Sequence, residues 1–457
     1  MIESYRKPFP SPILKPKHLI SKFRLCYNYE MLHSILFGKL VSKVTTSFNL
    51  GSGSTWPGHL VLENDPKFIK KIIRKNPNLK IILIAGTNGK TTTTKALSHV
   101  LNSQSYSTIE NSSGANLTNG LASILLSNAS LLGKLKAEVL LFEVDENTLP
   151  LVLKEIPSPD GIVLLNLFRD QLDRYGEVNT IAQVWKNSIE KLQEDTLLIA
   201  NADDPLVAYT ASFAKRKIFF SVDNSYKKAT QLSHAVDSIT CPKCNSDLNY
   251  FEISYSHLGN YTCTSCSFKN PQAQVLQFET SLLGVYNRYN LTAVLLTARE
   301  LFKTQPAAAA KSLKTFKPAF GRQESIITDG RTIMLLLSKN PTGFNESLKV
   351  ALENETQSLL ILLNDRIPDG RDISWIWDVD FEVLKNKKIK IIASGDRAYD
   401  IANRLSFAGV KHEVFEDYQA AYQEVLNQTQ KNKTLTILPT YSAMLEIRKL
   451  IGGRAIL

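Results

Sequence analysis

A short glycine-containing segment, GTNGKTT at residues 86–92, has the residue types of a phosphate-binding site. It follows an apolar, β-branched run, KIILIA at residues 80–85, and it opens a stretch with helical character. A glycine turn between a strand and a helix points backbone N–H groups at phosphate oxygens, and the positive end of the helix dipole adds to this attraction. In such a turn the lysine reaches the terminal phosphates and the hydroxyl that follows it ligates Mg²⁺. We therefore expect a nucleotide site in which Lys90 contacts the β- and γ-phosphates and Thr91 binds the metal ion.

Four cysteines form a second chemical signal, because they occur as two pairs with Cys-x-x-Cys spacing. The first pair is Cys241 and Cys244, the second is Cys263 and Cys266, and 18 residues separate the pairs. Each pair grips one metal ion through a tight turn, and the span between them fits a β-hairpin. Four thiolates complete a tetrahedron, so the pattern predicts a structural Zn²⁺ site in a zinc ribbon. The fifth cysteine, Cys26, is interpreted as a small buried residue.

The elements that must position these residues alternate between strand and helix patterns. Short apolar runs with helical patterns between them read as buried strands at residues 80–85, 139–144, 161–165 and 196–200. Strands of this kind belong to an α/β fold with a parallel sheet covered by helices on both faces. Polar, cysteine-bearing residues 238–270 interrupt the pattern and are predicted to be an insertion.

A second, smaller α/β alternation begins at Gly321. Its predicted strands are residues 332–337, 358–363, 389–393 and 434–438. A chain of 457 residues is too long for one compact core, so two or three domains are expected. The predicted domains are a basic and apolar extension (residues 1–50), an ATP-binding domain with the insertion (51–320) and an α/β C-terminal domain (321–457).

The composition is that of a soluble protein, with 43% hydrophobic and 21% charged residues. There is no run of about 18 apolar residues and no signal-peptide pattern at the start, so the sequence predicts a cytoplasmic protein. The net charge of +11 fits a solvated basic surface, but also an anionic substrate, an acidic partner, nucleic acid or a membrane face. Residues 15–43 mix basic and apolar side chains, as in an interfacial helix at the inner face of a membrane or in a helix docked on the rest of the protein.

The short form of the phosphate loop resembles the loop of the Mur ligase and folylpolyglutamate synthetase superfamily. Further segments that share this resemblance are FEVDE at residues 142–146, NADDP at 201–205, GVYNRYN at 284–290 and GRQE at 321–324. The resemblance implies ATP and Mg²⁺ as cofactors, with a Mg²⁺-binding glutamate at Glu143. It also implies that Asn287 and Asn290 contact the nucleotide and that Arg322 reaches the transferred phosphate. The predicted nucleotide site therefore consists of Gly86, Thr87, Asn88, Gly89, Lys90, Thr91, Thr92, Glu143, Asn287, Asn290 and Arg322.

Three positions depart from the superfamily pattern or allow two interpretations. Gln171 stands where many relatives have a histidine metal ligand, so the number of Mg²⁺ sites stays open. Tyr286 replaces the histidine of the asparagine-containing motif. Lys186 falls near the position of a carbamylated lysine in amino-acid-adding ligases, although a solvated helix lysine is the simpler interpretation.

The C-terminal part differs from ordinary members of the superfamily. LSKNPTGFNE at residues 337–346 replaces the sequence DYAHNP and lacks its leading aspartate, and residues 363–382 are dense in carboxylates. Together with the GSGSTWPG turn at residues 51–58 and the four-cysteine insertion, these segments resemble the MurT family of lipid II isoglutaminyl synthase subunits. The resemblance implies that ATP activates the α-carboxylate of D-glutamate in the lipid II stem peptide as an acyl phosphate, which ammonia converts to D-isoglutamine. It also implies a GatD-type glutaminase partner that supplies the ammonia.

The acidic loop at residues 363–382 is the candidate for handling ammonia. A carboxylate that faces the acyl phosphate holds NH₄⁺ or accepts its proton, which raises the nucleophilicity of ammonia near neutral pH. We favour Asp372, then Asp369, as this catalytic group. In the alternative interpretation, one of these aspartates only satisfies backbone N–H groups of its loop. Trp375 and Trp377 are interpreted as core residues or as anchors of a partner interface.

Two other functions are compatible with the sequence. The first is a ligase of the same superfamily that adds an amino acid instead of ammonia. The second is a nucleic-acid-binding ATPase that uses the zinc ribbon and the basic surface. The ribbon interrupts the ATPase domain and no aromatic stacking motif is evident beside it, so amidation is preferred and no nucleic acid is expected as a partner.

Overall fold

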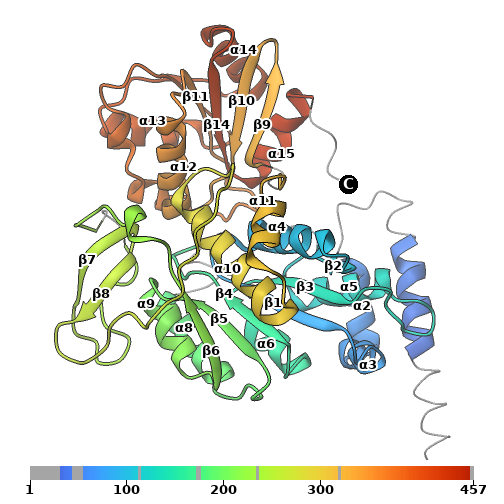
Figure 1. The fold of residues 1–457 in the computed structure, drawn as a ribbon. Coiled ribbons are helices and arrows are strands. Elements are labelled where there is room, and N and C mark those ends of the chain that lie inside the picture. Colours follow the sequence, from blue (N-terminus) through green and yellow to red (C-terminus); the bar gives the residue numbers. More distant parts are fainter. Residues whose placement is uncertain are drawn as a thin grey trace, which may run out of the picture. The chain divides into compact units, whose positions relative to one another are not determined.

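The computed structural model describes residues 31–43, 55–111, 115–170, 177–232, 236–317 and 321–452 (Figure 1). The chain divides into two compact units. One comprises residues 1–78 and 119–136, and the other comprises residues 79–118 and 137–457. None of the helices in the described part of the chain has the length and apolar character that a membrane crossing requires.

The first unit is helical. Its elements are a helical segment at residues 31–43, α2 (Trp56–Asn64), α3 (Phe68–Lys75) and most of α5 (Thr118–Asn128). The backbone N–H of Gly58 donates to Ser123 Oγ over 2.9 Å, so α2 and α5 approach closely at a residue that has no side chain. Near the start of α3, the buried Lys71 ammonium pairs with Asp65 at 2.9 Å. This buried pair ties α3 to the end of α2.

The second unit contains a six-stranded parallel sheet with the strand order β2-β3-β1-β4-β5-β6. Its strands are β1 (Lys80–Ala85), β2 (Thr108–Glu110), β3 (Val139–Val144), β4 (Gly161–Leu164), β5 (Leu197–Asn201) and β6 (Arg216–Phe220). The helices against one face are α4 (Lys90–Ser103), α10 (Val285–Phe302) and α11 (Pro306–Leu313). Those on the other are α6 (Leu149–Glu155), α8 (Val178–Ile189) and α9 (Pro205–Ser212). The predicted parallel sheet covered on both faces is confirmed.

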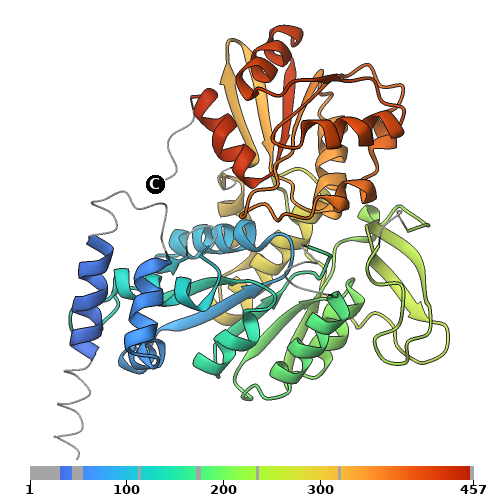
Figure 2. The ribbon, with the colours of Figure 1, turned by 180° about the vertical axis from the view of Figure 1, so that it is seen from behind.

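The same unit contains a second six-stranded sheet with the order β13-β12-β11-β14-β10-β9 (Figure 2). Its strands are β9 (Arg322–Thr328), β10 (Arg331–Leu336), β11 (Ser358–Leu362), β12 (Lys390–Ser394), β13 (Glu413–Val414) and β14 (Thr434–Pro439). One apolar core lies between the sheet and α12 (Pro341–Glu353), α13 (Ala398–Phe407), η2 (Ser374–Asp378) and η3 (Phe381–Leu384). A second core lies under α14 (Tyr418–Gln428) and α15 (Tyr441–Leu450). The predicted α/β C-terminal fold is confirmed, although the sequence reading missed β9 and β13.

The cysteine-bearing insertion between β6 and α10 forms an antiparallel hairpin of β7 (Leu248–Tyr255) and β8 (Leu258–Cys263). A short 3-10 helix, η1 (Asn224–Tyr226), precedes it. The hairpin has a small apolar core of its own, which is made of Cys241, Leu248, Tyr250, Ile253 and Tyr261. It also bonds to the segment that follows β5, because the Gly259 N–H donates to the Asp203 carbonyl at 3.1 Å. The insertion is therefore packed against the carboxyl end of the first sheet.

A buried ion pair stabilises the junction between the insertion and the first sheet. Lys227 Nζ lies 2.9 Å from Asp203 Oδ2, and both side chains are at most 3% exposed. The hydroxyl groups of Ser221 and Tyr289 each donate to the same Asp203 oxygen at 2.6 Å. The Asp203 carboxylate thus joins the insertion, β6 and α10.

Substitution of Lys227 tests how much this junction contributes to stability. A buried carboxylate that loses its cation costs about 3–5 kcal/mol, so Lys227→Met should lower the free energy of unfolding by that amount. The matched control is Lys215→Met, because Lys215 pairs with Glu194 at the surface, where the side chains are 55% and 80% exposed. A surface pair is worth less than about 1 kcal/mol. Equal losses for the two variants in urea-induced unfolding would contradict the assignment.

Candidate active site

The phosphate loop connects β1 to α4 at the carboxyl end of the first sheet. Gly86 and Gly89 have φ angles of +146° and +89°, which residues with a side chain rarely adopt. A Cβ on Gly89 would lie 2.2 Å from Asn290 Oδ1 of α10. Glycine is thus required both for the turn and for the close approach of α10.

Asn166, at the end of β4, holds the loop in place. Its Oδ1 accepts from the Asn88 N–H at 2.8 Å, its Nδ2 donates to the Asn88 carbonyl at 3.0 Å, and its own carbonyl accepts from the Thr87 N–H at 3.0 Å. The sequence analysis did not name Asn166 as a site residue. Its signal was its position directly after a buried strand, beside the end of β1.

The Lys90 side chain is buried under the loop among carboxylates. Its ammonium group donates to the Gly86 carbonyl at 2.6 Å and to Glu146 Oε2 at 3.1 Å, and it lies 3.4 Å from Asp145 Oδ1. Burial by itself would lower the pKa of Lys90, but the charges of Glu146 and Asp145 outweigh it and raise that pKa above its ordinary value. Lys90 is therefore a fixed cation at the base of the loop. Sequence reasoning did not assign Asp145 and Glu146 to the site.

Glu143 lies at the end of β3 and faces the start of α4. Thr91 Oγ1 donates to Glu143 Oε2 at 2.7 Å, and the Glu143 side chain is almost fully buried. Burial raises the pKa of Glu143, while the Thr91 hydrogen bond and the charge of Arg322 offset only part of this effect. Burial likewise lowers the pKa of Arg322, and the Glu143 carboxylate opposes that shift. A threonine hydroxyl beside a buried carboxylate is an oxygen pair of the kind that Mg²⁺ prefers.

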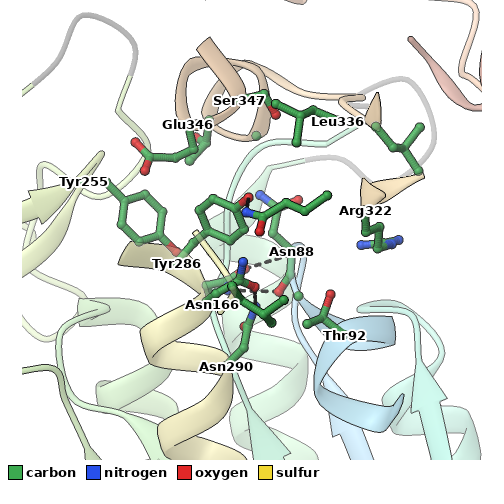
Figure 3. A pocket seen from close by; sticks show the side chains of 17 residues that line it. Asn88, Thr92, Asn166, Tyr255, Tyr286, Asn290, Arg322, Leu336, Glu346 and Ser347 are labelled. Carbon is green, nitrogen blue, oxygen red and sulfur yellow. Dashed lines mark hydrogen bonds between the residues drawn. The ribbon is translucent and has the colours of Figure 1, made fainter. Parts of the chain in front are cut away.

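A pocket opens next to this loop, and residues of α10, α12 and the second sheet line it together with loop residues (Figure 3). The lining residues are Asn88, Gly89, Thr92, Asn166, Tyr255, Leu282, Tyr286, Asn287, Asn290, Arg322, Gln323, Leu336, Leu337, Thr342, Gly343, Glu346 and Ser347. Six predicted nucleotide-site residues are among them: Asn88, Gly89, Thr92, Asn287, Asn290 and Arg322. The two asparagines of α10 do not cap it, because the N-cap residue is Gly284.

Polar contacts connect the phosphate loop to the second sheet beside the pocket. Asn340 Nδ2 donates to Asn88 Oδ1 at 3.0 Å, while Asn340 Oδ1 caps α12 by accepting from the Gly343 N–H at 2.8 Å. Lys339 forms an ion pair with Asp170. Burial raises the pKa of Asp170, although the Lys339 charge opposes this effect. The LSKNP segment thus supplies an amide to the phosphate loop and a cation to Asp170, contacts that its sequence did not indicate.

The two aspartates predicted to handle ammonia lie in the loop after β11, and neither lines this pocket. Asp369 is buried and accepts from the N–H and the hydroxyl of Ser442, the N–H at 2.8 Å. Burial raises the pKa of Asp369, and the Ser442 hydrogen bonds offset part of the shift. Asp372 is exposed and accepts from the Ser374 N–H at 2.8 Å. Both aspartates therefore accept backbone N–H groups, as the alternative interpretation of this loop expected.

The remaining positions singled out from sequence have ordinary surroundings or lie outside the described residues. Lys186 pairs with Glu190 at 3.5 Å and lies over the Phe213 ring, as a helix lysine at the surface does. The Trp377 side chain is half exposed, with its ring centroid 5.6 Å from that of Phe407. Trp375 packs on Phe344 in the core under α12. Gln171 and Cys26 lie outside the described residues.

The four cysteines of the two pairs converge at one end of the β7–β8 hairpin. Cys241 Sγ lies 3.7 Å from Cys266 Sγ, Cys244 Sγ lies 3.4 Å from Cys263 Sγ, and all four sulfurs are within 4.8 Å of one another. A tetrahedron with Zn–S bonds of about 2.3 Å places its sulfurs about 3.8 Å apart. The predicted convergence of the cysteines is confirmed, and their spacing fits one tetrahedral metal ion.

Comparison with known proteins places this arrangement in a class. The sequence profile of the Mur ligase middle domain matches residues 84–298. A solved pseudomurein peptide ligase type C from Methanothermus fervidus has a TM-score of 0.63 and 20% identity, over 86% of this chain and 84% of that one. The MurF ligase of Thermotoga maritima in complex with ADP has a TM-score of 0.60 and 16% identity, over 86% and 85%. Fold and phosphate loop together define the chain as a ligase of the Mur type.

The second sheet identifies the family more narrowly. The profile of the MurT ligase C-terminal domain matches residues 337–444. The lipid II isoglutaminyl synthase (glutamine-hydrolyzing) subunit MurT of Streptococcus pneumoniae (strain ATCC BAA-255 / R6) is 32% identical over 431 residues, which are 89% of this chain and 94% of that protein. The subunit of the same name from Staphylococcus aureus (strain COL) is 30% identical over 415 residues, 86% and 91% of the two chains. The chain belongs to the MurT family, which confirms the resemblance seen in the sequence.

The environment of Glu143 gives a pH prediction for the protein without nucleotide or Mg²⁺. A carboxyl group whose pKa is raised on folding costs stability once pH exceeds its ordinary pKa, and this cost grows until pH passes the raised value. Glu143→Gln removes the cost, so the variant should be more stable than the original protein near pH 7.5, and the difference should shrink toward pH 5. Urea-induced unfolding over this range measures it. A difference that does not change with pH would contradict the buried, proton-binding state of Glu143.

Proposed function

We propose that this protein is the synthetase subunit of a glutamine-hydrolysing lipid II isoglutaminyl synthase. In this role it would use ATP to amidate the α-carboxylate of D-glutamate in the stem peptide of a lipid II-type precursor. The proposal rests on membership of the MurT family and on one observation above all. The pocket beside the phosphate loop is completed by Arg322 and α12 of the second sheet, so a phosphoryl group at the loop has a cation of the other sheet beside it.

Each polar group of the site then has a role in activating the carboxylate. Lys90 and the loop N–H groups bind the β- and γ-phosphates, and Asn287 and Asn290 contact the nucleotide. Thr91 and Glu143 would hold Mg²⁺, which when bound would supply positive charge to the phosphate oxygens. Arg322 stabilises the charge on the phosphoryl group as it passes from ATP to the substrate carboxylate. The transfer breaks the bond to ADP and forms an acyl phosphate.

The second half of the reaction needs ammonia. Ammonia attacks the acyl carbon, the C–O bond to phosphate breaks, and the products are the amide, inorganic phosphate and a proton. Within the described residues every cysteine belongs to the four-cysteine cluster, so none of them is available as the nucleophile of a glutaminase. We infer that a separate glutaminase subunit supplies the ammonia, and that Asp372, with Asp369 as the second choice, holds or deprotonates it on its way to the acyl phosphate.

The amino-acid-adding alternative has weaker support. A UDP-N-acetylmuramoylalanine–D-glutamate ligase of Geobacter sp. (strain M21) is 28% identical to this chain, but only over 54% of this chain and 46% of that protein. The C-terminal profile that matches here is that of the MurT family. This profile covers most of the second sheet, and the match to the MurT family there favours ammonia over an amino acid.

Lys90→Ala tests the central assignment. The variant should lose at least about 99% of ATP-dependent amide formation, because a cation that binds the transferring phosphoryl group is worth several kcal/mol in the transition state. The matched control is Lys95→Ala on the same helix, where the lysine pairs with Glu110 near the surface. The assay measures isoglutaminyl product from a lipid II analogue with ATP and ammonium chloride. Activity retained in Lys90→Ala would contradict the role assigned to Lys90. If product formation required a free amino acid instead of ammonia, the protein would be an amino-acid-adding ligase and the amidation proposal would be wrong.

Asp372→Asn tests ammonia handling. The exposed Asp372 touches only its own loop among the described contacts, so folding and nucleotide affinity should be unchanged. Amide formation should fall by about 10²-fold, the usual size of a lost general base. If nucleotide affinity changes and the rate of amidation at saturation does not, Asp372 has another role and Asp369→Asn becomes the test.

We further propose that the four-cysteine cluster binds one structural Zn²⁺. Cys241→Ser should release zinc and lower the thermal unfolding temperature, because the small hairpin core depends on its metal. Metal analysis of the purified chain should give one zinc per protein and none for the variant. A metal-free variant with unchanged stability would contradict this site.

A further inference from the structure

Strand β7 extends from the cysteine cluster to the nucleotide pocket. Leu248 at its start pairs with Cys263, and Tyr255 at its end pairs with Leu258 next to the hairpin turn. The eight residues of β7 span roughly 23 Å at the usual rise of a strand. Tyr255 is one of the residues that line the pocket. The insertion therefore reaches the candidate active site with one of its own side chains.

At the pocket, Tyr255 is packed between two residues that belong to the phosphate machinery. Its ring centroid lies 5.9 Å from those of Phe168 and Tyr289. Phe168 donates its N–H to Thr87 Oγ1 at 3.0 Å and accepts from the same hydroxyl at 3.1 Å, so it is bonded to the phosphate loop. Tyr289 lies in α10 between the two asparagines of the nucleotide site, Asn287 and Asn290. A displacement of β7 would thus disturb both Phe168 beside the phosphate loop and Tyr289 beside the two asparagines of α10.

A hydrogen-bond chain fixes the end of the strand. Ser254 Oγ lies 2.8 Å from the Tyr289 hydroxyl, which in turn donates to Asp203 Oδ2 at 2.6 Å. At the turn, the fully buried His257 ring lies 4.9 Å from the Phe168 ring. These contacts lie at the pocket end of the hairpin. The other end of the hairpin holds its small apolar core and the four cysteines, so a metal ion bound there would restrain that end.

The chemistry of this side of the pocket fits a nucleobase. Figure 3 shows the rings of Tyr255 and Tyr286 on one side of the pocket, and Arg322 and Thr92 on the other. Aromatic rings offer flat faces for stacking to a base, whereas the arginine and the loop suit phosphates. Building on the proposed function, we propose that β7 is a wall of the nucleotide site, that Tyr255 contacts the base or ribose of bound ATP, and that a metal ion held by the four cysteines keeps this wall in place.

Two probes, one with a nucleobase and one without, test in the full chain whether Tyr255 contacts the base or ribose. Isothermal titration with a non-hydrolysable ATP analogue and Mg²⁺ should show about tenfold weaker binding for Tyr255→Ala and a change of less than about twofold for Tyr255→Phe. Phe251→Ala, on the same strand with its ring 48% exposed, is the matched control and should bind normally. Tripolyphosphate lacks the base and should bind Tyr255→Ala as it binds the original protein. Unchanged affinity of Tyr255→Ala for the ATP analogue would overturn the proposal.

The result for the original protein separates this inference from the proposed function. If the ATP analogue does not bind to it, or if Lys90→Ala binds the analogue equally well, the proposed function fails first. If Lys90 matters and Tyr255 does not, only the inference fails.

The metal link has two tests of its own. Removal of zinc with a chelator, followed by transfer into Mg²⁺ buffer, should raise the Kd for the ATP analogue at least about fivefold, and added zinc should restore it. Ser254→Ala keeps all four cysteines and removes the bond to Tyr289, so it should weaken binding about threefold with zinc retained. A zinc-free protein that binds the analogue normally, or a Ser254→Ala protein with unchanged Kd, would overturn the coupling.

Discussion

The site depends on the interactions of the buried Lys90 ammonium group. It lies among the carboxylates of Asp145, Glu146, Glu143 and Asp170, and it donates a hydrogen bond to the Gly86 carbonyl of its own loop. Glu143, Asp145 and Glu146 lie at or just after the end of β3, and Asp170 lies in the segment that follows β4. Because β3 and β4 are the two neighbours of β1, the sheet order brings these groups to the phosphate loop. With Arg322 and Lys339 the site has three cations for four acids. A nucleotide would add negative charge here, and the oxygens of Thr91 and Glu143 are donor atoms of the kind that a divalent cation prefers.

The local parts of this arrangement could be predicted from sequence. A strand, a glycine turn and a helix are adjacent in the chain, so the sequence GTNGKTT was enough to predict the local geometry of the phosphate loop. Apolar runs predicted the main strands for the same reason. β9 was missed because its side chains alternate between partial and full exposure, and β13 because it has only two residues.

Contacts between distant segments could not be seen in the same way. Asn340 bonds to Asn88 across 252 positions, and Asp369 accepts from Ser442 across 73. Neither hydrophobic periodicity nor the spacing of motifs predicts hydrogen-bond partners that lie so far apart in the sequence. The loop with Asp369 and Asp372 shows the limit most clearly: its acidic composition indicated chemistry, whereas the structure gives both side chains backbone partners. Neither side chain lines the pocket beside the phosphate loop, and their role in handling ammonia stays a prediction.

The spacing of the four sulfurs has a consequence for handling the protein. An S–S bond of about 2.0 Å needs paired sulfurs to close by more than 1 Å from their positions here, and the nearest pairs join one Cys-x-x-Cys turn to the other. Bound metal keeps the thiolates apart, but a metal-free chain in air is free to oxidise across the two turns. Preparations that differ in reductant and zinc would then contain differently cross-linked hairpins, although the polypeptide is the same.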